Sequence, residues 1–100
     1  MEEINKHIEQ IKKLCDAQGV KSLFAFGSVL HTKFNPKSDI DLLVDIEDSD
    51  PLSYSNKYFN LKFSLEQIFD RKIDLLELRA LKNRFLKQEI ERTKLQIYGE

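Results

Sequence analysis

Two carboxylates and a glycine-serine pair are the residues of this chain whose types and spacing could do chemistry. Gly27-Ser28 is followed, after ten residues, by Asp39-Ile40-Asp41. Side chains alternate along a β-strand, so acids at positions i and i+2 project from the same face. Two such carboxylates repel each other unless a cation lies between them, and Mg²⁺ prefers oxygen ligands and is bound together with substrate phosphates. The spacing therefore predicts a site for magnesium and a nucleotide.

Asp74 is a candidate third ligand, because it lies inside the apolar stretch 72–78 that we predict to be a strand. If this strand neighbours the one that carries Asp39 and Asp41, Asp74 approaches the pair from the side. Three carboxylates can hold two divalent ions, which clamp the attacking and leaving oxygens of an in-line displacement. Phosphoryl or nucleotidyl transfer needs little else from a protein. We expect Asp39 and Asp41 to hold both ions, and Asp74 to hold the catalytic ion and help to deprotonate the acceptor hydroxyl.

Gly27 and Ser28 are candidate phosphate-binding residues. Glycine allows a phosphate to approach the backbone closely, and Ser28 offers a hydroxyl and an N–H at the start of a helical turn, where anions are favoured. An Asp-x-Asp at a strand edge can also be a plain turn signal. Here Ile40 and Leu42 flank the acids, and burying unpaired carboxylates is costly. This context favours the metal site.

The order of elements predicts an α+β fold, with mixed α/β layers, in a single domain over residues 1–100. Amphipathic spacing, apolar runs and Gly, Asn and Pro breaks locate the elements. We expect helices at 3–18, around 29–34, at 51–69 and at 83–93, and strands at 20–26, 40–46 and 72–78, with 95–98 either a last strand or a continuation of the helix. Short buried strands that alternate with helices indicate a sheet with helices packed against it.

Composition narrows the class of protein. The net charge is −1, so the chain is not a generic polyanion binder, and we expect no direct contact with nucleic acid. Cys15 is the single cysteine, which excludes an intrachain disulfide and suits a reducing, cytoplasmic environment. Its place on a predicted helix beside Leu14 favours a buried structural thiol. The sequence has no signal peptide and no run of about 18 apolar residues, so we expect no membrane span.

The stretches 23–28 and 38–44, with the acids and the Gly-Ser pair at this spacing, resemble the signature of the nucleotidyltransferase superfamily related to DNA polymerase β. The chain is similar to its minimal, MNT-type branch. The resemblance implies a mixed sheet of three to four strands flanked by helices, and transfer of a nucleoside monophosphate to a hydroxyl with two Mg²⁺ ions. By position, it implies that Gly27 and Ser28 bind the nucleotide and that Asp39, Asp41 and Asp74 are the metal-binding catalytic triad.

Many members of this branch are antitoxins paired with a HEPN-domain toxin, an RNase that they adenylylate on a tyrosine near its active site. The resemblance thus implies AMP transfer from ATP to such a toxin, and the role of a type VII-like antitoxin. Many relatives carry arginines and a glycine just after the Gly-Ser pair, where this chain has Val29, His31 and Thr32. A missing arginine removes a strong phosphate contact.

Two other functions stay open at the level of the sequence. The chain could transfer nucleotides to a small molecule such as an aminoglycoside, although enzymes of that kind usually have an additional domain for which 100 residues leave no room. It could also be a non-catalytic module that neutralises a toxin by contact, although an intact set of three acids argues against loss of catalysis.

Overall fold

A computed structural model describes residues 2–27 and 39–99 of the chain. Within them a four-stranded sheet has the order β3-β2-β1-β4. β1 is antiparallel to both β2 and β4, whereas β2 is parallel to β3. The elements are α1 (Glu2–Asn5), α2 (Ile8–Ala17), β1 (Val20–Phe26), β2 (Ile40–Ile46), α3 (Pro51–Phe69), β3 (Ile73–Glu77), the 3-10 turn η2 (Leu78–Ala80), α4 (Arg84–Thr93) and β4 (Leu95–Gly99).

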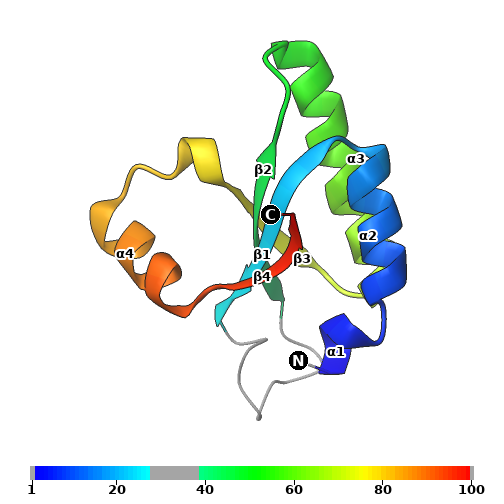
Figure 1. Cartoon of the computed structure of the whole chain (residues 1–100), viewed down its shortest axis with the longest axis horizontal. Coiled ribbons are helices and arrows are strands. Elements are labelled where there is room, and N and C mark those ends of the chain that lie inside the picture. Colours follow the sequence, from blue (N-terminus) through cyan, green and yellow to red (C-terminus); the bar gives the residue numbers. More distant parts are fainter. Residues whose placement is uncertain (1, 28–38, 100) are drawn as a thin grey trace.

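The helices form a layer on each side of the sheet. Figure 1 shows α2 and α3 together on one side and α4 on the other. On β2, Ile40, Leu42, Val44 and Ile46 are buried in the core that faces α2 and α3. The intervening residues of the strand face the α4 side, because side chains alternate. The predicted α+β fold with a mixed, helix-flanked sheet is therefore confirmed.

The ends of α3 follow local signals. The Asp50 side chain accepts a hydrogen bond from the Ser53 N–H at 2.9 Å, and Pro51 occupies the first turn. Both features stabilise a helix start, since an N-cap oxygen pairs with a free backbone N–H and proline needs no partner there. Asp70, with a φ of 52°, ends the helix in the left-handed conformation. The helix runs over 51–69, as the sequence predicts.

The N-terminal helical segment is divided into two helices, α1 and α2. The predicted helix over 3–18 is wrong as a single element: it is interrupted at Lys6 and His7. At this break the His7 ring packs edge-on against Phe69, with ring centroids 5.5 Å apart. The helix expected around 29–34 lies outside the described residues.

Residues 95–99 form a strand rather than a continuation of α4, because they pair with β1.

Cys15 is a structural thiol, as the sequence predicts. The Cys15 side chain is fully buried in α2, as expected for a structural thiol. Burial, with a smaller contribution from the charge of Asp16, raises its pKa to about 12, so the thiol stays protonated and unreactive near neutral pH. No helix among the described residues is long and apolar enough to span a membrane.

Asp48 joins the end of β2 to the start of α3. It forms an ion pair with Lys57 at 2.8 Å and accepts hydrogen bonds from the Ser53 hydroxyl and from the Asp50 N–H. These contacts, that with Lys57 first, hold the pKa of the Asp48 carboxyl well below its usual range. The charged form of Asp48 is thus the one that the folded protein favours.

Leu61 and Leu52 test how much of the stability of α3 comes from its inner face. Leu61 is fully buried, whereas Leu52 is 72% exposed on the same helix. We expect Leu61→Ala to lower the free energy of unfolding by about 2–5 kcal/mol, because it leaves a cavity in the core. Leu52→Ala, the matched control, should change it by less than about 0.5 kcal/mol. Urea denaturation measures both, and equal losses would contradict the packing described here.

The depressed pKa of Asp48 predicts a pH dependence of stability. A carboxyl with a lowered folded-state pKa stabilises the protein above its unfolded pKa, near 4, and this contribution is lost as the pH falls further. We therefore expect Asp48→Asn to melt below the wild type at pH 7, and the difference to shrink between about pH 4 and pH 2. Thermal melts at a series of pH values measure this. A constant difference across the series would contradict the proposed role of the Asp48 charge.

Candidate active site

The parallel register of β2 and β3 brings two of the three predicted acids together. Asp41 of β2 lies directly opposite Asp74 of β3. Asp39 precedes β2 by one residue, two positions before Asp41. Asp39 and Asp74 are exposed, and Asp41 is half-buried. Asp41 and Asp74 therefore meet on the face of the sheet opposite the main core, at the end where both strands begin.

The environment of Asp41 shows that the three charges interact. Its pKa is raised, first by burial, then by the charges of Asp74 and Asp39, and finally by a side-chain hydrogen bond with Asp74. A raised carboxyl pKa means that the surroundings oppose the negative charge. A cation bound among the three oxygens would relieve this repulsion, and carboxylate oxygens are the ligands that Mg²⁺ prefers.

The three carboxylates are suitable ligands for a metal ion, but their positions do not form a complete metal site. Across residues 2–27 and 39–99, no group of three His, Cys, Asp or Glu side chains is gathered closely enough to hold a metal ion by itself. The chemistry of the donor set nevertheless fits a hard divalent cation, because all three groups are carboxylates and two of them lie opposite each other on neighbouring strands. The ion would have to draw the third carboxylate toward this pair.

Gly27 is required by the closeness of Asp41. It follows β1, whose last residue, Phe26, pairs with Asp41. Gly27 has a φ of +76°, and a Cβ at this position would lie 2.5 Å from Oδ2 of Asp41. A side chain here would be strained by the backbone conformation and would also collide with the carboxylate. Sequence reasoning assigned Gly27 to the approach of a phosphate, whereas the structure shows that it first makes room for an acid.

Several residues of the sequence motif cannot be placed. Ser28, the second predicted nucleotide-binding residue, lies outside the described residues, as do Val29, His31 and Thr32. The described part of the candidate site therefore consists of Gly27, Asp41, which it contacts, and Asp39 and Asp74, whose charges act on Asp41.

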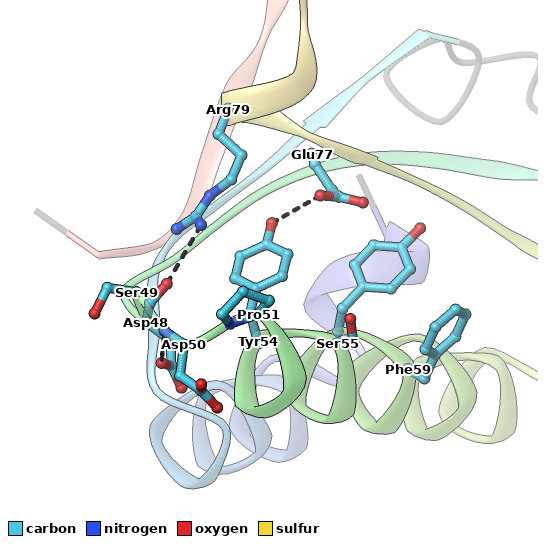
Figure 2. Close-up of a pocket in the computed structure, with 10 residues that line it drawn as sticks. Asp48, Ser49, Asp50, Pro51, Tyr54, Ser55, Phe59, Glu77 and Arg79 are labelled. Atoms are coloured by element: carbon cyan, nitrogen blue, oxygen red, sulfur yellow. Dashed lines mark hydrogen bonds between the residues drawn. The ribbon is translucent and has the colours of Figure 1, made fainter.

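A second feature, which sequence reasoning missed, is a pocket of about 460 Å³. It is formed between the first turns of α3 and the other ends of β2 and β3, and Tyr54, Phe59, Glu77 and Arg79 line it (Figure 2). The Tyr54 hydroxyl donates to Glu77 Oε2 at 3.0 Å. The aromatic residues clustered early in α3 could have indicated this pocket from the sequence. No sequence feature indicated that Arg79 lines it, because only the fold brings Arg79 to this place.

Comparisons with known proteins add to this geometry. The family model described as "Polymerase beta, Nucleotidyltransferase" matches residues 9–100. A protein of Methanocaldococcus jannaschii named as a candidate protein adenylyltransferase, MJ1379, is 33% identical over 92 residues, which cover 91% of each chain.

Solved structures show the same fold. A structure described as a candidate minimal nucleotidyltransferase superposes with a TM-score of 0.76 at 28% identity and covers 94% of this chain and 92% of that one. A second structure is that of a tri-AMPylated HEPN toxin in complex with an MNT antitoxin from Shewanella oneidensis. It superposes with a TM-score of 0.66 at 24% identity, covering 96% and 72% of the two chains.

Gly27 and Gly19 provide a matched test of the contact with Asp41. Both have a positive φ, but a Cβ at Gly19 would meet only the flexible end of Lys57, at 3.3 Å. Gly19→Ala should cost about 1–3 kcal/mol of stability from backbone strain alone. Gly27→Ala should cost more, because its Cβ also displaces the carboxylate. In an Asp41→Ala background the cost of Gly27→Ala should fall to that of Gly19→Ala, as measured by urea denaturation. Costs that simply add would contradict the contact.

Proposed function

Because the chain belongs to the polymerase β nucleotidyltransferase family, we propose that it transfers AMP from ATP to a tyrosine hydroxyl of a partner HEPN-domain toxin, and so acts as the antitoxin of that pair. The observation that carries the proposal is the register that sets Asp41 opposite Asp74 beside Gly27. The name of the relative MJ1379 and the AMPylated HEPN toxin of Shewanella oneidensis in complex with an MNT antitoxin support the choice of AMP and of a protein acceptor.

Asp39, Asp41 and Asp74 would hold two Mg²⁺ ions. When bound, such ions neutralise charge on the triphosphate and on the attacking and leaving oxygens. Asp41 is the member whose position is most constrained, because it is half-buried and lies against Gly27. Asp74 is exposed on β3, at the edge of the sheet, where an acceptor can reach it.

In the proposed reaction the tyrosine oxygen forms a bond to the α-phosphorus of ATP, and the bond from that phosphorus to the pyrophosphate oxygen breaks. The phenolic proton passes to the carboxylate of Asp74, which acts as the general base. Pyrophosphate leaves, and AMP stays on the tyrosine. Gly27 leaves room beside Asp41 because it has no side chain, and the proposal assigns the hydroxyl and N–H of Ser28 to the phosphates.

Transfer of labelled AMP tests the proposal. The purified chain is incubated with α-labelled ATP, MgCl₂ and the HEPN-domain protein proposed as its partner. We expect label on that protein, and none after EDTA. Asp41→Asn and Asp74→Asn should each lower the rate about 100-fold or more, since even the outer-shell partners of a metal ligand are worth 10–100-fold.

Asp45→Asn is the control for loss of a charge on the same strand. Asp45 is half-buried like Asp41 and lies four residues, or about 13 Å, further along β2, so its variant should keep most of the activity. Label that persists in Asp41→Asn would contradict the assignment of the site. Label on an aminoglycoside, or a stable toxin complex without transfer, would replace the proposed function with one of the two alternatives.

A further inference from the structure

The outer side of α3 carries apolar side chains where a surface helix normally has polar ones. Tyr54, Leu61, Leu65 and Phe69 make up the buried face. Yet Leu52, Phe59 and Phe63 are 72%, 49% and 56% exposed. They are seven and four residues apart, so they share one side of the helix. An exposed apolar row of this kind, here called the α3 strip, is typical of a surface that another molecule covers.

The rings of the α3 strip are ordered against one another. Phe59 stacks on Phe63 with centroids 6.0 Å apart, and Tyr58 meets Phe59 edge-on at 5.1 Å. Such ring pairs stabilise one another beyond the area that they bury. The strip is therefore preorganised, which lowers the entropic cost of binding a partner.

The α3 strip continues into the pocket at the start of α3, because Phe59 belongs to both. In Figure 2, Tyr54 and Phe59 project from α3, with Glu77 and Arg79 on neighbouring segments of the chain. A partner that covers the strip can thus also place a side chain in a cavity of about 460 Å³.

The hydrogen bonds of the pocket leave more acceptors than donors for a ligand. The Tyr54 hydroxyl is used by Glu77, and the Tyr58 hydroxyl by the Leu75 carbonyl at 2.6 Å. The carboxylates keep spare capacity, since each has about four acceptor positions. The Ser49 and Ser55 hydroxyls, which also line the pocket, can donate or accept, so a ligand that donates hydrogen bonds finds the larger number of partners here.

Arg79, the one base among the residues that line the pocket, is already engaged. Its Nη2 donates to the Ile46 carbonyl at 2.6 Å and its Nη1 to the Asp48 carbonyl at 3.3 Å. Its guanidinium carbon lies 4.0 Å from the centroid of the Tyr54 ring. Arg79 therefore holds the ends of the strands through two of its five N–H groups.

The side chains that line the pocket carry more negative than positive charge. Three carboxylates line the pocket, those of Asp48, Asp50 and Glu77, against the single guanidinium of Arg79. Asp48 is paired with Lys57, whereas the Asp50 carboxylate is exposed and accepts one backbone hydrogen bond. A cation inserted here would meet an excess of negative charge, which attracts it.

We propose that the α3 strip and this pocket dock the protein that the chain modifies, through a segment in which apolar side chains flank a lysine or arginine that enters the pocket. The proposal rests on the proposed function for the identity of the partner. Glu77 is three residues beyond Asp74 on β3, or about 10 Å, and its side chain lies on the α3 side of the sheet. The docking surface therefore does not cover Asp41 and Asp74, which lie on the other face of the sheet and at the other end of the strands.

Binding of the HEPN-domain protein, measured by calorimetry separately from AMP transfer, tests this docking surface. Phe59→Ala should weaken binding about tenfold or more, as expected for a central aromatic contact. Asp50→Asn removes a charge but keeps an equally good helix cap, and should weaken binding and reduce its salt dependence. Thermal melts establish that both variants stay folded. In transfer assays these variants should raise the KM for the partner and leave kcat unchanged.

Matched controls separate the docking surface from general effects. Phe85 is 81% exposed on α4, on the other side of the sheet, so Phe85→Ala should bind like the wild type. Glu9→Gln removes an exposed charge from α2 and should do the same. Asp41→Asn should bind normally and fail to transfer AMP.

The outcomes distinguish the docking surface from the proposed function. Unchanged affinity in Phe59→Ala and Asp50→Asn overturns the docking surface, even if AMP transfer is observed. Weakened affinity in both, with no transfer by the wild type, overturns the proposed function and leaves the docking surface supported. Sedimentation that shows a dimer of the chain alone, dissociated by Phe59→Ala, overturns the proposal in favour of a second copy as the occupant.

Discussion

The parallel pairing of β2 with β3 is the constraint on which the rest of the structure depends. It sets Asp41 opposite Asp74, although 32 positions of the chain separate them. Parallel neighbours cannot be joined by a tight turn and need a long crossover, which α3 provides over 19 residues. The length and packing of α3 thus decide whether the two carboxylates meet.

The sheet accommodates like charges because its two faces have different tasks. One face of β2 is buried, with Ile40, Leu42, Val44 and Ile46 in the core. Burial of these side chains, each worth about 1.5–3 kcal/mol, holds the strand in register. The other face carries Asp41, whose raised pKa reflects burial and the charges of Asp74 and Asp39. Hydrophobic packing on the core face of the sheet therefore holds together carboxylates that repel each other on the opposite face.

The two ends of the β2–β3 pair differ in their chemistry. At the beginning of the strands, Asp41 lies against Gly27, and the charges of Asp74 and Asp39 act on it. At the other end, Arg79 binds two backbone carbonyls, and aromatic residues of α3 line a pocket. α3 contributes to the core with one side and to the pocket with another. A single helix can therefore stabilise the catalytic arrangement that we propose and also present a surface to a partner.

The sequence by itself determined the elements whose signals are local. β1, β2 and α3 have the predicted bounds, because buried apolar runs and an Asp-Pro helix start are read from neighbouring residues. The Gly-Ser and Asp-x-Asp spacing likewise identified the family. Only the tertiary structure decided the contact of His7 with Phe69 and the role of Gly27 beside Asp41. These features depend on contacts between residues far apart in the chain, and local patterns carry no information about which distant residues will meet.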